Sequence, residues 1–183
     1  NWYLSDTVSY VGADYIKSKG DFLLGKLCKI AGISEDIVVE NQNNSGGAQY
    51  LLKGIDYLFW ADVKSVSMAL YKYMADEEEK ERKTLSEKQL ETYNPIQKWC
   101  ADMWAVLWCG LKRGKAVRIS KELDFSWAST MGHDEWQRCK IFHNAGITDS
   151  HEGKVFYKGD FIYTDPWNFD FSKIDPRTNS SNY

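Results

Sequence analysis

A short polar segment of this chain carries two glycines and an amide side chain, Asn44-Ser45-Gly46-Gly47-Ala48-Gln49-Tyr50. Because glycine has no side chain, the backbone amides beside it can approach a ligand closely, and the amide of Gln49 both donates and accepts hydrogen bonds. Ligands rich in hydroxyl groups need such partners. Gly46, Gly47 and Gln49 are therefore candidates for binding a substrate. The alternative is a glycine turn that leads into an ordinary helix near Ala48.

A second candidate is a carboxylate among tryptophans, because Asp102 falls in one predicted helix with Trp99, Trp104 and Trp108. A carboxylate within an apolar run is costly to bury unless it is paired or used. Asp102 is therefore a candidate for hydrogen bonding to an acceptor hydroxyl or deprotonating it. Trp104 is a candidate for packing against the apolar face of a ligand. A structural salt bridge, or a position on a narrow exposed edge, would explain Asp102 equally well.

The third candidate is a histidine at the end of an apolar segment, where His143 is followed by Asn144 and, further on, by Lys154 and Lys158. Neutral imidazole binds divalent cations, and a lysine can meet phosphate oxygens. His143 is therefore a candidate metal ligand, and Asn144, Lys154 and Lys158 are candidates for substrate binding. A histidine satisfied by its structural neighbours is the alternative.

Composition and motifs exclude several classes of protein. The chain has 183 residues, of which 43% are hydrophobic and 27% charged, so it can bury a core. Its net charge of −3 disfavours a general nucleic-acid binder. The sequence contains no P-loop, GxGxxG, GxSxG or HExxH motif. No apolar run reaches the roughly 20 residues that cross a membrane, so we expect no membrane span.

The four cysteines are scattered, and no CxxC pair occurs. This pattern favours buried thiols in a reducing compartment over a disulfide framework or a cysteine zinc site, and it predicts a cytoplasmic protein. The positions are Cys28, Cys100, Cys109 and Cys139.

The elements that must position these residues are predicted from hydrophobic spacing. Helices are expected over 21–31, ending at Gly32, over 57–82, and from Pro95 to about residue 112. The helix over 57–82 carries one apolar stripe and ends in a charged segment that we expect to project from the body.

Short strands are expected over 36–40, 116–119, 140–143 and 155–157. The fold class is therefore mixed α/β and helix-rich. We expect one globular domain over 1–165 and an extended tail over 166–183.

Taken in chain order, several short sequence segments, here called phrases, resemble those of bacterial and phage-type glycosyltransferases with a GT-A-like fold. The resemblance covers most of the chain. The phrases are Ser5-Asp6-Thr7, Tyr15-Ile16-Lys17-Ser18-Lys19-Gly20, Gly46-Gly47-Ala48-Gln49-Tyr50, Trp99-Cys100-Ala101-Asp102-Met103-Trp104-Ala105, His143-Asn144-Ala145-Gly146 and Phe156-Tyr157-Lys158-Gly159.

The resemblance implies transfer of a sugar from a nucleotide-sugar donor to a saccharide or other hydroxyl acceptor, assisted by Mn²⁺ or Mg²⁺. His143 would be the late metal ligand, and Lys154 or Lys158 would face the diphosphate. Gly46, Gly47, Gln49 and Asp102 would surround donor sugar and acceptor.

The chain departs from the GT-A pattern because no intact Asp-x-Asp motif appears, and Asp6 is at most its remnant. The nucleotide-binding strands that precede that motif are also absent. We therefore expect the acceptor-side part of a glycosyltransferase, with Asp6 as a second candidate metal ligand. The competing classes are a non-catalytic carbohydrate-binding module, and an interaction or assembly module that uses the charged segment at 77–83.

Overall fold

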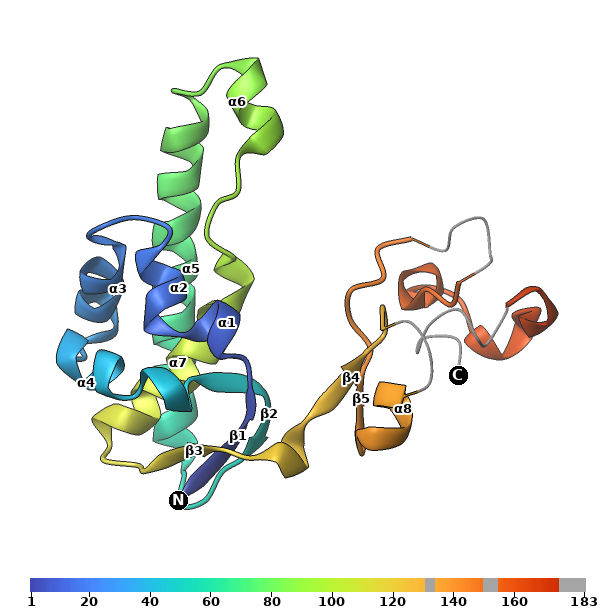
Figure 1. Ribbon diagram of the computed structural model, residues 1–183, viewed down its shortest axis with the longest axis horizontal. Coiled ribbons are helices and arrows are strands. Elements are labelled where there is room, and N and C mark those ends of the chain that lie inside the picture. Colours follow the sequence, from blue (N-terminus) through green and yellow to red (C-terminus); the bar gives the residue numbers. More distant parts are fainter. Residues whose placement is uncertain (131–133, 150–154, 175–183) are drawn as a thin grey trace. The chain divides into compact units, whose positions relative to one another are not determined.

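The computed structural model describes residues 1–130, 134–149 and 155–174. The chain forms two compact units, Asn1–Lys121 and Glu122–Tyr183 (Figure 1). The sequence instead predicted one domain over 1–165 and an extended tail. The first unit ends near Lys121 because, among the described residues, the buried members of the main hydrophobic cluster lie between Trp2 and Val117. Within the expected tail, the structure places short 3₁₀ helices at Pro166–Asn168 and Phe171–Lys173.

Unit 1 is built around a small mixed sheet in the order β2-β1-β3. Strand β1 (Trp2–Asp6) runs antiparallel to β2 (Gly46–Leu51) and parallel to β3 (Val117–Ile119). The strand predicted near 116–119 is confirmed. The pairing brings together three segments that lie far apart in the sequence.

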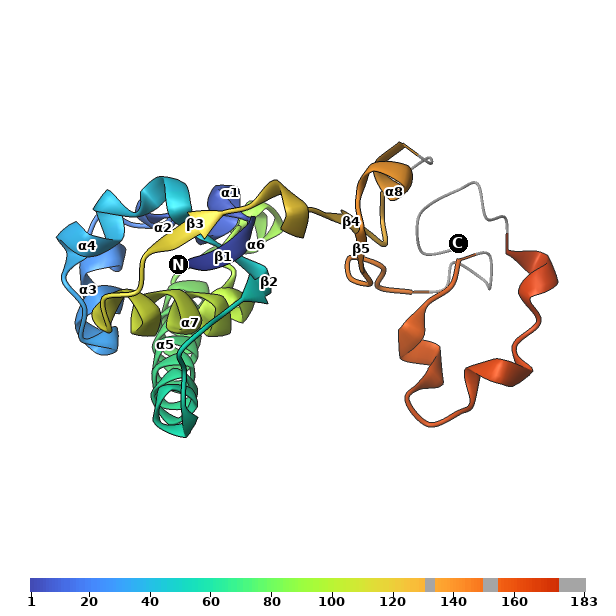
Figure 2. The ribbon, with the colours of Figure 1, turned by 90° about the horizontal axis from the view of Figure 1, so that it is seen from below.

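Seven helices are described in unit 1, and α7 lies between the sheet and α5 (Figure 2). Short 3₁₀ helices occur at Gln42–Asn44 and Lys98–Cys100. The α-helices are α1 (Val8–Val11), α2 (Ala13–Lys17), α3 (Leu23–Ala31), α4 (Glu35–Glu40), α5 (Tyr57–Arg82), α6 (Glu87–Thr92) and α7 (Ala101–Lys112). Together with the sheet they confirm the mixed, helix-rich α/β class.

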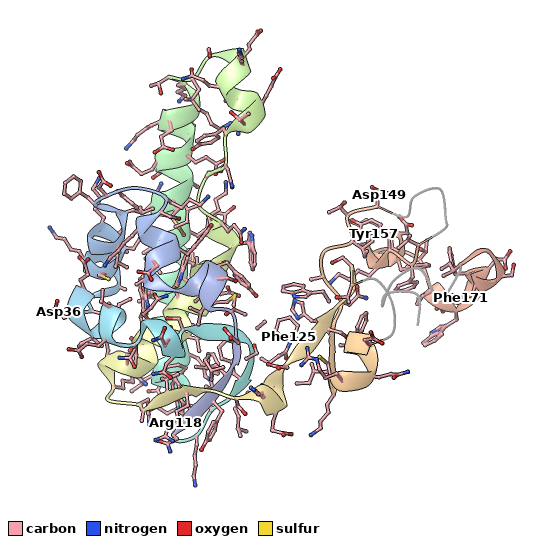
Figure 3. All side chains as sticks on the ribbon, in the orientation of Figure 1. Asp36, Arg118, Phe125, Asp149, Tyr157 and Phe171 are labelled. Carbon is pink, nitrogen blue, oxygen red and sulfur yellow. The ribbon has the colours of Figure 1, made fainter. Side chains whose placement is uncertain are left out.

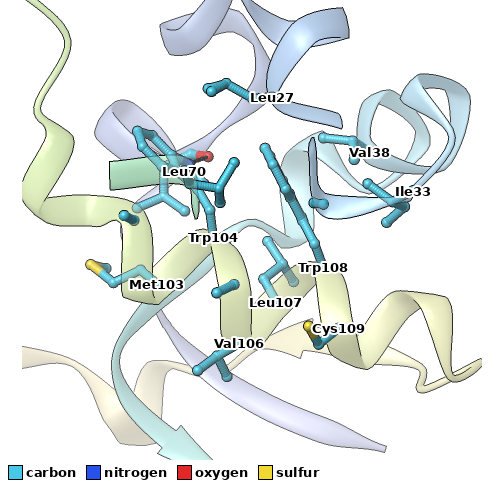
Figure 4. Close-up of a cluster of buried hydrophobic side chains, with 14 of the residues drawn as sticks. Leu27, Ile33, Val38, Leu70, Met103, Trp104, Val106, Leu107, Trp108 and Cys109 are labelled. Carbon is cyan, nitrogen blue, oxygen red and sulfur yellow. Dashed lines mark hydrogen bonds between the residues drawn. The ribbon is translucent and has the colours of Figure 1, made fainter. Parts of the chain in front are cut away.

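The core of unit 1 surrounds α7, which is buried along nearly its whole length. Trp104 and Trp108 stack with their ring centroids 6.3 Å apart and point toward Leu27, whereas Val106 points to the opposite side of the helix (Figure 4). Burial on more than one face was expected from the apolar residues around this helix, and it is confirmed. Each fully buried side chain of this size contributes about 1.5–3 kcal/mol.

The predictions for α3 and α5 are confirmed. α3 ends at Gly32, whose φ of 64° is the left-handed conformation of a glycine cap. α5 spans the predicted range; Phe59, Val63 and Leu70 are buried on its inner stripe. Its far end and α6 project beyond the rest of unit 1 in Figure 1, as predicted for the charged segment. Ion pairs such as Lys83–Glu79, at 2.6 Å, lie along that end.

One predicted strand is a helix in the structure, and one predicted helix is a strand. Residues 36–40, predicted as a strand from Ile37-Val38-Val39, belong to helix α4, which follows an extended Ser34 and carries acidic residues in its first turn. The helix predicted to start near Ala48 is strand β2, because this segment pairs with β1.

The helix predicted from Pro95 begins only at Ala101. Tertiary hydrogen bonds hold the preceding segment: the Gln97 amide donates to the Tyr15 hydroxyl at 2.8 Å, and Lys19 donates to the Asn94 carbonyl at 3.1 Å. Because these hydrogen bonds join residues that are far apart in the sequence, the local sequence pattern could not predict them.

Unit 2 contains the short parallel strands β4 (Phe125–Trp127) and β5 (Ile141–His143), with helix α8 (Asp134–Arg138) between them in the chain. The strand predicted at 140–143 is confirmed. The strand predicted at 155–157 is wrong, because Phe156 stacks on Phe161 at 5.4 Å and Tyr157 precedes the 3₁₀ helix Lys158–Phe161. Figure 3 labels Phe125 on β4 and Phe171 in the C-terminal part of this unit.

Cys28, Cys100 and Cys109 are buried, as predicted for structural thiols. Burial raises the pKa of Cys28 to about 11 and that of Cys100 to about 12, so both thiols stay protonated at neutral pH. Across the described part of the chain, no helix combines the length and apolar character that crossing a bilayer requires.

Candidate functional site

The end of β1 and the start of β2 form an irregular corner. Asp6 lies opposite Gly46, and the register shifts between Leu4 and Asp6. The Ser5 hydroxyl donates to the Gly47 carbonyl and accepts a hydrogen bond from the backbone N–H of Gln49 at 3.2 Å. Such irregular pairing is common next to functional sites because it redirects side chains.

Ala48 lies in this corner with a φ of 66°, and it is the one non-glycine residue with positive φ among those described. The conformation costs about 1 kcal/mol or more for a residue with a Cβ. The strain is held in place by the pairing of β2 with β1. It marks the segment as one whose shape is fixed by its neighbours.

The two glycines of the corner serve packing. A Cβ on Gly46 would lie 2.2 Å from the Ser5 carbonyl oxygen, and a Cβ on Gly47 would lie 2.6 Å from both Met103 Cε and the Tyr50 hydroxyl. Both glycines are buried. They therefore bring β2 against β1 and the start of α7, which differs from the sequence-based expectation that they open the backbone to a ligand.

Two tyrosines lie near the carboxylates of this region: Tyr10 near Asp6, and Tyr50 near Asp102. Burial raises the pKa of Tyr10 to about 12, and the thiolate that Cys100 forms at high pH and the charge of Asp6 add to the shift. Burial also raises the pKa of Tyr50, with a further contribution from the charge of Asp102. The two carboxylates are exposed. We call Asp6, Tyr10, Gln49, Tyr50 and Asp102 the carboxylate corner.

Asp102 is the second residue of α7 and is exposed, which settles one alternative left open by the sequence. One of its oxygens accepts a hydrogen bond from the Met103 amide at 2.8 Å. Its charge is also favourable near the helix N-terminus. Among the residues that the structure describes, Asp102 makes no ion pair.

Trp104, predicted to contact a substrate, is fully buried, and its ring N–H donates to the Val11 carbonyl at 2.8 Å. It therefore packs the core and offers no surface to a ligand. The exposed tryptophan next to Asp102 is Trp99, which remains 53% exposed. One side of the Trp99 ring packs on Tyr10, with the centroids 5.7 Å apart.

A groove of about 690 Å³ runs between α5 and the start of α7, and Trp99 and Asp102 lie on one wall. Met68 and Tyr71 of α5 form the other, with 63% and 48% of their surfaces exposed. We call these four residues the Trp99 groove. Met68 and Tyr71 were not predicted as site residues because they lie outside the buried stripe of α5. Their spacing of three residues places them on one side of the helix, and it was the available signal.

The third set of predicted residues lies in unit 2. His143 packs against Trp127 and Phe125, with centroid distances of 4.9 and 5.0 Å. Burial, together with the positive charge of Lys158, lowers the pKa of His143, so the ring is neutral at neutral pH. Lys158 donates to the Asn144 carbonyl at 2.6 Å. These three residues are thus close together, and Lys154 lies outside the described residues.

A metal site was predicted from Asp6 and His143. Over the described ranges, no group of three His, Cys, Asp or Glu side chains could hold a metal ion. Asp6 belongs to unit 1 and His143 to unit 2. The ring contacts of His143 with Phe125 and Trp127 also account for its position without a metal.

Comparisons of the chain with protein-family models, with curated proteins and with solved structures give no match.

Proposed function

We propose that this chain takes part in transferring a sugar from a nucleotide-sugar donor to the hydroxyl group of an acceptor. The observation that carries the proposal is the carboxylate corner, where Asp6 and Asp102 are exposed on elements that both pack against β2. The ordered resemblance to GT-A-like glycosyltransferases supplies the reaction class.

Asp102 has the role of orienting the attacking hydroxyl. Its carboxylate accepts the hydroxyl proton as the acceptor oxygen bonds to the anomeric carbon of the donor sugar. The bond from that carbon to the nucleoside diphosphate breaks, and its electron pair leaves with the phosphate oxygen. In this proposal, Gln49 and Asp6 bind hydroxyls of the donor sugar or the acceptor.

The role of Asp102 is tested by replacing it with Asn in the full-length protein and measuring release of nucleoside diphosphate from a panel of nucleotide sugars. Loss of the base should lower turnover about 100-fold or more. Asp36→Asn is the matched control, because Asp36 is an exposed carboxylate on α4 outside the corner. Equal turnover in the Asp102 and Asp36 variants would refute this role.

The predicted Mn²⁺ or Mg²⁺ dependence is tested by titrating the full-length protein calorimetrically with each metal and the nucleotide-sugar panel. Heat that requires the metal, and that His143→Ala removes, would support the metal role carried by the resemblance. Saccharide binding without metal, together with no turnover of any nucleotide sugar, would support a non-catalytic carbohydrate-binding module. The exposed ring of Trp99 is the observation that favours this second candidate.

A further inference from the structure

We propose that the Trp99 groove is a saccharide-binding subsite that stacks a pyranose ring on Trp99 and Tyr71 and binds its hydroxyls through Asp102. Saccharide binding in the groove stands by itself. Only the assignment of that saccharide as the acceptor rests on the proposed function.

Each wall of the groove carries an exposed aromatic side chain, Trp99 on one and Tyr71 on the other. The Trp99 ring is held by Tyr10 at 5.7 Å with a 43° tilt, while 53% of the residue remains open. Met68 and Tyr71 lie three residues apart on α5 and therefore face the same side. A pyranose presents an apolar C–H face that packs on such flat, weakly polar surfaces.

The charges around the groove favour a neutral, hydroxyl-rich ligand. Lys72 pairs with Asp76 at 3.0 Å, and Lys98 pairs with Glu78, so a carboxylate partly offsets the charge of each lysine. Asp102 forms no ion pair among the described residues, and only one of its oxygens has a hydrogen-bond donor there. A phosphate or another anion would meet this carboxylate at close range, whereas sugar hydroxyls can donate to it.

The same carboxylate argues against a purely apolar occupant. A protein surface that covered Trp99 and Met68 closely would also remove Asp102 from water. Burying a carboxylate without a partner is expensive, so such a cover would need its own cation at this point. A sugar ring offers both kinds of contact in one ligand, because its apolar face packs on the aromatic side chains and its hydroxyls donate to Asp102.

The size and position of the groove agree with this assignment. Its volume of about 690 Å³ lies within the roughly 300–1,000 Å³ typical of small-ligand sites. Asp102 belongs to both the groove and the carboxylate corner, and Trp99 contacts Tyr10 of that corner. A sugar bound in the groove would therefore place hydroxyls beside the proposed base.

The test uses the full-length protein on an array of pyranose-containing glycans, followed by calorimetry with the trisaccharide that gives the strongest signal. We expect binding without metal or nucleotide, weakened at least 10-fold in Trp99→Ala and restored in part by Trp99→Phe. Trp167→Ala is the control, because Trp167 is 84% exposed but lies in unit 2. Circular dichroism of each variant confirms that it is folded.

Three results would overturn the proposal: no glycan binds, Trp99→Ala binds as well as the parent chain, or light scattering shows a dimer that Trp99→Ala dissociates. The last result would assign the groove to a second copy of the chain. Saccharide binding that depends on Trp99, with no turnover of nucleotide sugars, would keep the subsite and remove the transferase proposal. Turnover that is unchanged in Trp99→Ala would keep the transferase proposal and remove the assignment of the bound saccharide as the acceptor.

Discussion

Tyr10 of the carboxylate corner makes the stability of the fold depend on pH. Its ordinary pKa of 10.0 rises to about 12 in the folded chain, chiefly through burial. A phenol whose pKa is higher in the folded state favours folding fully below the unfolded value. That contribution is then lost as the pH rises from about 10 to about 12. The fold should therefore weaken across this interval.

The replacement Tyr10→Phe should reduce this alkaline loss, because it keeps the ring against Trp99 and removes the ionisable group. Urea unfolding at about pH 8 and about pH 11 measures the difference for each chain. Tyr57→Phe is the control, since Tyr57 is 78% exposed on α5. An equal loss of stability in the parent and the Tyr10 variant would contradict the prediction.

Residue types singled out the first turn of α7, but they did not show which side chains face outward. Asp102, Trp104 and Trp99 are neighbours in sequence, and only the packing of α7 against the sheet and α5 decides that Trp104 is buried. An apolar face on both sides of a helix hides the direction of each tryptophan. The exposure of Trp99 also depends on Tyr10, which lies far away in the chain.

At the scale of single elements, α3 contains two glycines whose replacement should have opposite effects. Gly25 lies inside the helix, and an added Cβ would lie 3.0 Å from the mobile carboxylate end of Glu35. Gly32 ends the helix at a φ of 64°. We expect Gly25→Ala to stabilise the fold by about 0.5–1 kcal/mol and Gly32→Ala to destabilise it by about 1–2 kcal/mol.

Chemical unfolding of the two variants, with equal m-values, measures these differences. Each variant serves as the control for the other, because both add one methyl group to the same helix. The cap assignment fails if both substitutions change the free energy of unfolding in the same direction.

Elements with a long, regular pattern could be predicted, whereas short ones could not. α5 repeats its apolar stripe over many turns, so its bounds follow from spacing. α4 has only six residues, and its Ile37-Val38-Val39 run is typical of a strand. β2 exists because β1 pairs with it, and β1 itself has only five residues. Tertiary contact therefore decides what local preference leaves open.

At the scale of the whole molecule, the predicted site residues fall into two groups along the chain. Asp6, Gln49 and Asp102 belong to unit 1, while His143 and Lys158 belong to unit 2. Their shared role in one reaction was inferred from the order of sequence phrases. The structure explains each group through its own packing: strand pairing and α7 for the first, and aromatic contacts for the second.

Unit 1 should fold when residues 1–121 are produced alone, because the buried members of its main hydrophobic cluster, over the described ranges, all lie between Trp2 and Val117. The closing strand β3 lies within this range, so the sheet is complete without unit 2. Residues 1–121 should unfold cooperatively in urea and keep the buried environment of Trp104 and Trp108. Tryptophan fluorescence and circular dichroism should give coincident transitions.

The matched control is a chain of residues 1–112, which keeps α7 but lacks β3 and leaves one edge of β1 unpaired. It should lose cooperative unfolding or a large part of the free energy of unfolding, because Val117 and the β1–β3 hydrogen bonds are removed together. If residues 1–121 behave like the shorter chain, with non-coincident transitions, then unit 2 is needed for the core, and the division of the chain after Lys121 does not describe independent folding.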